Sequence, residues 1–543
     1  MTVRENDARA AVLDTAHVGD IRGALGTIRH DDIAPRNGWM ARLKTLLAIL
    51  GPGLIVMVGD NDAGAFSTYT QAGQNYGTTL LWTMALLIPV LYVNQEMVLR
   101  LGAVSRVGHA RLILERFGKF WGAFSAIDLF ILNALTIVTE FIGISLGMAF
   151  LGVPKIAGVM LAAVLILLSA STGDFRRFER FSLALVAGSL LLVPILVMIH
   201  PPMTQVAHDF LVPQMPVGGH LADVMLLIIG IVGTTVAPWQ LFFQQSYVID
   251  KRITPRFIKY ERADLWIGIV LVVIGAVAMI AFTAQVFAGH AESGHFRDAG
   301  AVAQGLASYY GRVPGVLFAL ALIDASIIGA SAVSLSTAYA LGDVLSMKHS
   351  LHRKPTDAIG FYAMYCGVIV VAAALVLLPN VPLGLLVNAV QTLAGVLLPS
   401  ATVFLLMLCN DKAVLGPWVN SRTTNVLGAL TVAVLVLLSI ILTAAVIFPD
   451  LSSRAIERIL IGGGVACLAV TLAVCLMQIR EERLAPAAQP RMPLEAMYHW
   501  RMPAIDQLKP MVLSARNKVW MSILWLYLLL AVGMLIYKVV ISL

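Results

Sequence analysis

The sequence predicts an all-α polytopic membrane protein with two broken spans, and three observations point to this fold class. Of its 543 residues, 59% are hydrophobic and 13% are charged, about half the charged share of soluble proteins. The mean hydropathy is +0.84. Apolar stretches of roughly 17–25 residues, long enough to cross a bilayer, recur along the chain. The first and the sixth of these stretches are interrupted by glycine, proline and polar residues.

About thirteen apolar stretches predict membrane spans. They lie near residues 46–71, 79–99, 121–151, 156–172, 181–200, 222–248, 264–288, 314–342, 359–379, 383–409, 424–447, 458–479 and 520–541.

Basic residues gather in alternate loops. They are frequent before residue 45 and in segments 100–119, 176–180, 251–262 and 348–354, and scarce in 72–78 and 200–221. By the positive-inside rule, the N-terminus lies in the cytoplasm. The net charge of +7 therefore reports topology, and we expect a lipid bilayer, not a nucleic acid, as the partner.

The first break reads Gly59-Asp-Asn-Asp62-Ala-Gly-Ala65. A carboxylate at bilayer depth costs roughly 2.5–3.5 kcal/mol on insertion scales, so an acid there is by default functional. Asp62 is the first candidate for binding a cation, although Asp is also a preferred helix N-cap. The carbonyl of Gly59 would add an oxygen ligand. Asp60 is expected to face an outer water cavity as an accessory charge, or to sit at a wet helix end.

The second break reads Gly230-Ile-Val-Gly233-Thr-Thr-Val-Ala237-Pro238-Trp239. Pro238 removes a backbone donor, and the glycines and threonines before it favour unwinding, which would free the Thr234 carbonyl for a cation. Broken spans five helices apart have opposite orientations, which is the sign of an inverted repeat with a binding site between the breaks. Neither break holds Cys, His or Met at a coordinating position, which disfavours a soft metal.

Several other polar residues lie in apolar stretches. Gln391 is either a cation ligand or an interhelical hydrogen-bonding residue. Asp128, Glu140 and Asp324 could each relay protons or form a local pair, whereas Glu96 and Arg100 have the spacing of a structural ion pair. No nucleophile–base arrangement is visible, so we expect no enzyme and no cofactor.

Both breaks resemble the Nramp divalent-metal transporters. The likeness is carried by Gly51-Pro-Gly through Ala65, by Gly233 through Gln240, and by Glu140-Phe-Ile-Gly143. It implies a LeuT-like 5+5 inverted repeat with broken helices 1 and 6, plus two or three extra C-terminal helices. The expected parts are a cytoplasmic segment (1–44), the transport core (45–410), helices 11 and 12 (411–480), a Pro-rich cytoplasmic linker (481–519) and a terminal span (520–543).

The departures from the family pattern concern the metal. Where Nramp proteins have Asp-Pro-Gly-Asn, this chain has Asp62-Ala-Gly-Ala65; where they have Met-Pro-His, it has Ala237-Pro-Trp239. In the third span, Nramp proteins carry an aspartate in the proton path at the position that aligns with Ile137 of this chain. These replacements resemble those of the Nramp-related magnesium transporters, and they imply a metal site at Asp62, Gly59, Thr234, Ala65, Ala237, Asp60 and Gln391.

The sequence thus favours a monomeric secondary transporter in the bacterial inner (plasma) membrane. It would move Mg²⁺, and also Mn²⁺, as substrate by alternating access without proton coupling. One alternative is a proton-coupled Mn²⁺/Fe²⁺ symporter that uses Asp60 or Glu140 in place of the lost groups. Another is an organic-solute carrier of the same architecture, in which helix N-termini would bind a carboxylate.

Overall fold

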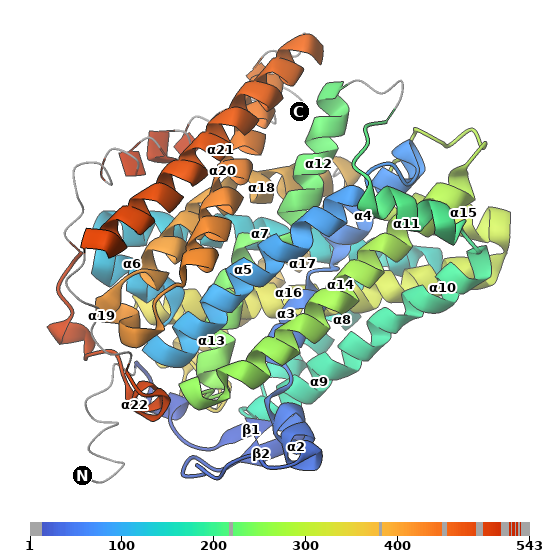
Figure 1. The fold of residues 1–543 in the computed structure, drawn as a ribbon. Helices are drawn as coiled ribbons and strands as arrows, with labels where there is room; N and C mark the ends of the chain where they lie inside the picture. The colour runs from blue at the N-terminus through green and yellow to red at the C-terminus, as the bar shows by residue number, and fades with distance from the viewer. Residues whose placement is uncertain are drawn as a thin grey trace.

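The computed structural model describes residues 13–216, 221–379, 383–447, 453–484 and 492–511, with a few further positions between 518 and 533. Helices dominate this part of the chain, and its one sheet is a two-stranded hairpin (Figure 1). Among the described residues, nine helical stretches are long and apolar enough to cross a membrane. The number is ten if α2 (Trp39–Ile49) and α3 (Pro52–Gly59), which are bent by 53° relative to each other, count as one span.

The long helices follow the predicted spans closely. They are α5 (Trp82–Ser105), α7 (Lys119–Phe150), α8 (Lys155–Ala170), α9 (Phe175–Gly188), α10 (Leu192–Ile199), α12 (Leu221–Thr235), α13 (Pro238–Asp250), α14 (Ile258–Phe287), α16 (Arg312–Val344), α17 (Ile359–Leu377), α18 (Leu383–Cys409), α20 (Arg422–Ile447) and α21 (Ser453–Leu484).

The shorter elements comprise the two half-helices beside the first break and the segments that connect the long helices, many of them in regions predicted as loops. The α-helices are α2 (Trp39–Ile49), α3 (Pro52–Gly59), α4 (Ala63–Tyr76), α6 (His109–Phe117), α11 (Met203–Leu211), α15 (Ala299–Tyr310), α19 (Lys412–Leu415) and α22 (Leu494–His499). The 3-10 turns are η1 (Thr15–His17), η2 (Ser189–Leu191), η3 (Pro255–Phe257), η4 (Gly416–Trp418) and η5 (Ile505–Gln507).

Both predicted breaks are present. The first separates α3 from α4 at residues 60–62, and the second separates α12 from α13 at residues 236–237. In Figure 1, α12 rises above the break and α13 lies below it. The unwinding before Pro238 is shorter than predicted and does not reach Thr234, because α12 stays helical through Thr235. Gly233 serves close packing instead: a Cβ there would lie 2.8 Å from the Gly395 Cα.

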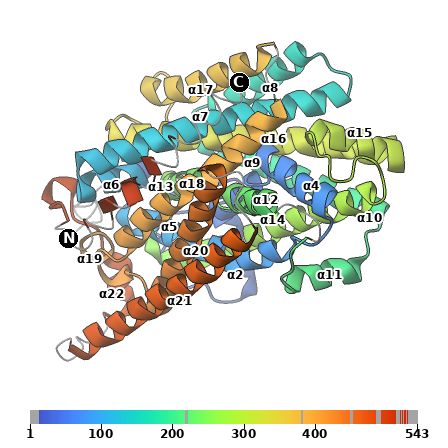
Figure 2. The same cartoon turned by 90° about the horizontal axis from the view of Figure 1, so that it is seen from above.

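The broken helices lie inside a ring of long helices. The half-helix α4 contacts α7, α12, α14 and α18, and α13 contacts α3, α5 and α16. Seen from above, α7, α8 and α17 lie on one side, and α20 and α21 on the other (Figure 2). The residues of both breaks, 60–62 and 236–237, are accordingly buried.

The extra C-terminal helices α20 and α21 pack on the edge of the bundle, where α20 contacts α5, α12 and α18. The predicted linker and terminal span lie largely outside the described residues. Of the terminal span, Leu524 and Leu528 are described, and both are buried in a cluster with Leu132 and Val390. The predicted division of the chain into five parts stays a prediction.

The N-terminal segment forms structure that the sequence did not predict. Strands β1 (Ile21–Gly23) and β2 (Gly26–Ile28) pair antiparallel, with Ile21 opposite Ile28, and they contact α2. Two glycines make this close approach possible, since a Cβ on Gly23 would lie 2.0 Å from the Ala48 carbonyl oxygen. We call the side of the bundle that carries this hairpin the N-terminal face.

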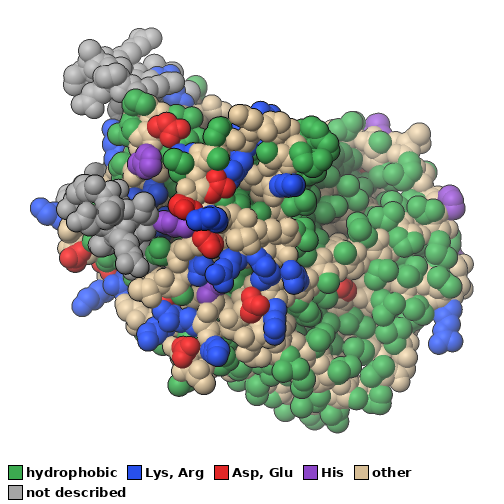
Figure 3. All heavy atoms as spheres, turned by 90° about the horizontal axis from the view of Figure 1, so that it is seen from below, with side chains coloured by type: hydrophobic (Ala, Val, Ile, Leu, Met, Phe, Trp, Pro, Cys, Tyr) green, Lys and Arg blue, Asp and Glu red, His purple; other side chains and the backbone are tan. Residues whose placement is uncertain are grey.

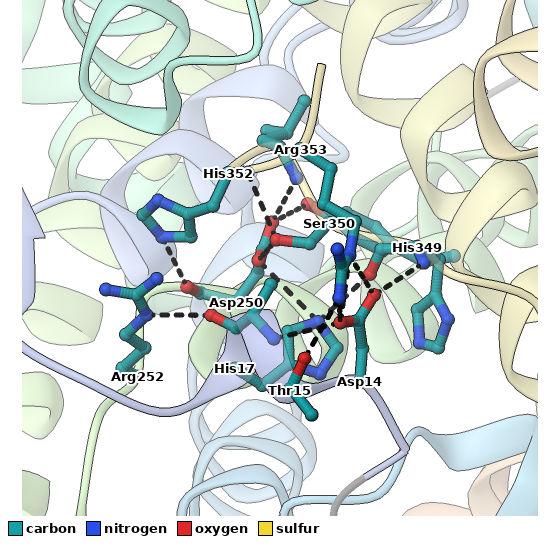
Figure 4. Close-up of polar contacts among 12 residues, drawn as sticks. Asp14, Thr15, His17, Asp250, Arg252, His349, Ser350, His352 and Arg353 are labelled. Carbon is teal, nitrogen blue, oxygen red and sulfur yellow. Dashed lines mark hydrogen bonds and ion pairs between the residues drawn. The ribbon is translucent and has the colours of Figure 1, made fainter. Parts of the chain in front are cut away.

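A polar cluster fastens the start of the described chain to this face (Figure 4). Arg353 Nε donates to Asp14 Oδ2 at 2.9 Å, and the His349 backbone N–H donates to the same oxygen at 3.0 Å. His17 Nε2 lies 3.0 Å from the His349 carbonyl oxygen and 3.6 Å from Asp250 Oδ1. The cluster joins the N-terminal segment to the end of α13 and to the loop after α16.

Candidate cation site at the two helix breaks

Asp62 occupies the N-cap of α4. Its Oδ1 accepts a hydrogen bond of 2.9 Å from the Ala65 backbone N–H, and the residue is 3% exposed. The predicted capping role is therefore real. It does not exclude cation binding, because a carboxylate has about four acceptor positions. A negative charge at this helix end also interacts favourably with the helix dipole.

Glu140 of α7 joins this break. Its Oε2 accepts a 3.1 Å hydrogen bond from the Ala63 N–H, whereas its buried Oε1 has no partner among the described residues. A Cβ on Gly329 of α16 would lie 2.9 Å from Glu140 Cδ and 3.0 Å from Asp62 Cβ. A glycine at 329 therefore lets α16 approach at the point where these two acids meet.

The expectation that Asp60 faces water, at a cavity or a wet helix end, is wrong. Asp60 is fully buried, and its Oδ1 accepts a hydrogen bond from the Gln240 side-chain amide of α13. Gln95 Nε2 of α5 donates to Gln240 Oε1 at 2.9 Å. Neither glutamine figured in the expected site. The signal that could have found Gln240 is its position, a single amide between apolar residues two places after Pro238.

The other predicted oxygen donors lie at helix ends. Gly59 is the last residue of α3, and Thr234 lies in the last turn of α12. The carbonyl oxygens of a last turn receive no hydrogen bond from an N–H group of their own helix, so they are available to other partners. The Thr234 hydroxyl is buried and has no partner among the described residues, whereas Thr235 Oγ1 lies 2.7 Å from the Tyr69 hydroxyl.

Gln391 of α18 lies against the first break. A Cβ on Gly64 would lie 1.8 Å from Gln391 Nε2 and 3.1 Å from Asp62 Oδ1, so the amide and the carboxylate flank the same glycine. The buried Nε2 has no hydrogen-bond partner in the part of the chain that the structure describes. Gln391 thus lies beside Asp62, and whether its side-chain oxygen binds a cation stays a prediction.

Ala65 and Ala237 are both buried beside the breaks and offer no side-chain donor. Ala237 is the N-cap residue of α13. The Trp239 ring approaches Gly59, where a Cβ would lie 3.8 Å from its Cη2 atom. At Ala65, Ala237 and Trp239 the breaks therefore gain no thioether or imidazole ligand, and the polar side chains beside them are the carboxylates and amides described above.

Asp60, Asp62 and Glu140 form no ion pair among the described residues. Buried carboxylates without a basic partner are very costly in their charged form, so a cation or protons must balance their charge. No group of three or more His, Cys, Asp or Glu residues in the described ranges is arranged to hold a metal by itself. A cation here would therefore need the helix-end carbonyls as well.

The remaining intramembrane acids lie elsewhere. Glu96 pairs with Arg100 at 3.1 Å, as predicted, and also with Arg262 at 2.5 Å. The carboxylate of Asp324 lies against Gly188. Asp264 accepts hydrogen bonds from the first N–H groups of α3, including that of Gly53 at 2.7 Å. This last contact, missed in the sequence, fixes the start of the first half-helix.

The part of the sequence that forms this site matches the model of a known protein family. The family model described as "Natural resistance-associated macrophage protein-like", or Nramp, matches residues 53–445. The chain belongs to the Nramp family. The matched range contains both helix breaks, α7 with Glu140 and α18 with Gln391.

Curated Nramp relatives agree over most of their length. "Divalent metal cation transporter MntH" of Xylella fastidiosa is 30% identical over 454 residues, which are 79% of this chain and 90% of that protein. The protein of the same name from Ralstonia nicotianae is 29% identical over 404 residues, 70% of this chain and 87% of its own.

A solved structure gives the fold. The manganese transporter of Eremococcus coleocola aligns with a TM-score of 0.62 at 23% identity, covering 83% of this chain and 97% of that one. With the two broken helices in place, the predicted LeuT-like Nramp architecture is confirmed. The chain is a multi-pass integral membrane protein.

Proposed function

We propose that this Nramp protein is a secondary transporter that moves divalent metal cations by alternating access at the two helix breaks. The observation that carries the proposal is Asp62, a buried carboxylate at the start of α4 with Glu140 beside it and no basic partner for either among the described residues. The names of its relatives, divalent metal cation transporters and a manganese transporter, support it.

Manganese is the first candidate ion, ahead of the magnesium expected from the sequence, because the solved structure of similar fold is a manganese transporter. Carboxylate, carbonyl and water oxygens suit Mn²⁺ as well as Mg²⁺, so the oxygen-rich breaks agree with either. Mg²⁺ is the second candidate because Ala65, Ala237 and Trp239 provide no amide, thioether or imidazole ligand. An ion that keeps several waters needs fewer protein ligands.

Proton coupling is favoured over the uncoupled transport expected from the sequence. Asp60 and Glu140 are buried next to the break that holds Asp62, and each could take up a proton from the side where the metal enters and release it on the side where the metal leaves. In the proton-coupled alternative drawn from the sequence, Asp60 or Glu140 serves in place of the lost groups.

The decisive experiment measures flux into proteoliposomes that contain the purified protein, with indicators for Mn²⁺, Mg²⁺ and internal pH. Coupled manganese transport predicts Mn²⁺ uptake with acidification of the lumen. Mg²⁺ uptake without acidification would favour the uniporter instead. Absence of flux for both metals, with measurable binding of an amino acid, would replace the proposal with an organic-solute carrier. The Asp62 carboxylate at the N-terminus of α4 disfavours that outcome, because it occupies the end where a substrate carboxylate would bind.

The orientation is also a proposal. Arg176, Arg252 and Arg353, from three of the basic loops, all contact the N-terminal segment. Basic loops thus share the N-terminal face, and the positive-inside rule places that face in the cytoplasm of a bacterial plasma membrane. A monomer is the expected state.

A further inference from the structure

A cavity of about 420 Å³ opens on the N-terminal face, away from the helix breaks. Three segments far apart in the chain form it: residues 19–33, residues 252–257 and residues 498–501, with one further residue from the end of α5. Its volume lies in the range of small-molecule sites. Figure 3 shows this face, where Lys and Arg side chains, with some Asp and Glu among them, gather over one part and hydrophobic side chains are most frequent over the other.

The walls of the cavity are strongly basic. Its five arginines are Arg29, Arg106, Arg252, Arg256 and Arg501, and they face two carboxylates, those of Asp31 and Asp32. His30 and His499 also line it. Arginines thus outnumber carboxylates among the side chains that line this one recess, which is different from basic residues spread over a flat surface.

Main-chain carbonyls hold three of these arginines in place. Arg252 Nε donates to the Ala16 carbonyl at 2.9 Å, Arg256 Nη1 to that of Ile33 at 2.9 Å, and Arg501 Nη1 to that of Tyr498 at 2.7 Å. A carbonyl fixes a guanidinium without cancelling its charge. The Arg256 guanidinium also lies 5.3 Å from the centre of the Tyr498 ring.

Arg29 and Arg256 have carboxylate partners that are exposed to solvent. The pair between Arg29 and Asp31 is solvent-exposed, with side chains 78% and 64% accessible. Ion pairs exposed in this way contribute little free energy. Glu495, the partner of Arg256, is 72% exposed. Asp32 is bound by Arg36, which adds another positive charge beside the cavity.

We propose that this cavity binds a phosphate-bearing anion, either a soluble nucleotide or the headgroup of an anionic lipid. Guanidinium groups are planar and bind phosphate oxygens in pairs, and several held in one cavity form a preorganised phosphate site. The ligand would join the N-terminal hairpin segment, the turn after α13 and the C-terminal segment around α22. This proposal does not depend on which metal the protein transports.

The test uses the full-length protein in detergent with EDTA present, so that no metal contributes. Calorimetry with ATP and with pyrophosphate at low salt measures the soluble source. Native mass spectrometry after release from phosphatidylcholine nanodiscs, with or without phosphatidic acid, measures the lipid source. We expect retention of at least one of these phosphate ligands, with affinity that falls as salt rises.

Two variants locate the site. Arg29→Ala removes an exposed side chain, and Arg29→Ala/Arg256→Ala removes charge from two of the three segments. We expect the double variant to weaken binding at least about tenfold, or 1.4 kcal/mol. Arg177→Ala, an exposed arginine at the start of α9, is the matched control and should bind as the unaltered protein does. Binding that both Arg29 variants leave unchanged, or no binding of any phosphate probe, would overturn the proposal.

Discussion

Gln240 donates a hydrogen bond from its side-chain amide to the carboxylate of Asp60, and so joins the second helix break to the first. Asp60 is the C-cap residue of α3, and Gln240 lies in the first turn of α13. The contact links two half-helices that alternating access would move relative to their neighbours. It is also the main change to the expected picture of this site, in which Asp60 was solvated.

Replacing Gln240 tests this link. Gln240→Leu leaves the buried Asp60 carboxylate without its donor, which should cost roughly 1–3 kcal/mol of stability. The measurement is thermal unfolding of the purified protein followed by tryptophan fluorescence. Gln244→Leu is the matched control, because Gln244 is equally buried in α13 and its amide atoms have no partner among the described residues. Equal melting temperatures for the two variants would contradict the role given to the Gln240 contact.

The Asp62 side chain caps α4, and one substitution can separate this role from its proposed role in cation binding. Asp62→Asn keeps an oxygen that can accept from the Ala65 N–H, and Asn caps helices as well as Asp, but it removes the negative charge. We expect near-normal thermal stability and a loss of metal uptake of at least about tenfold, or 1.4 kcal/mol. Initial rates of Mn²⁺ uptake into proteoliposomes provide the measurement. Unchanged uptake in Asp62→Asn would remove Asp62 from the cation site.

Ala237 offers a test of metal preference. Ala237→Met places a thioether beside the second break, and sulfur favours transition metals over Mg²⁺. We expect the ratio of Mn²⁺ to Mg²⁺ uptake to rise at least about threefold, or 0.65 kcal/mol. Ala237→Leu adds similar bulk without sulfur and should leave the ratio near its original value. If both variants change the ratio equally, the effect is one of size and the missing sulfur does not set the preference.

The cluster that holds the N-terminal segment should depend on pH through His349. Burial alone would lower the pKa of His349, but the Asp343 carboxylate, 3.0 Å away, outweighs it and raises the pKa to about 9. The ordinary value is 6.5. A pKa raised on folding gives stability that is complete below about pH 6.5 and is lost as pH rises through about 9.

Limited proteolysis at the basic residues of the N-terminal segment can follow this change, with protease activity calibrated at each pH. We expect protection of the segment at pH 6.5 and faster cleavage as the pH passes 9. His349→Gln, which cannot become charged, should cleave faster at pH 6.5 and lose this pH dependence. The same pH profile in both proteins would show that His349 does not control the attachment.

Local sequence features predicted the helices and the breaks well. Long apolar stretches gave the spans, and Pro238 with the Gly59–Ala65 stretch gave the positions of the interruptions, because proline and glycine act on the backbone within a few residues. The Glu96–Arg100 pair followed from its spacing on one helix. The extent of unwinding at Gly233 could not be predicted locally, since that glycine serves contact with Gly395 of another helix.

The sequence by itself determined that this chain forms membrane-spanning helices, that two of them are broken, and that an acid stands at the first break. Only the tertiary structure decided which groups meet there. Asp60 and Gln240 are 180 residues apart in the chain, and Ala63 and Glu140 are 77 apart. The same holds for the N-terminal hairpin and the arginine-lined cavity. Helix periodicity and backbone breakers act over a few residues, whereas the partners of a buried polar group are fixed by the packing of distant helices.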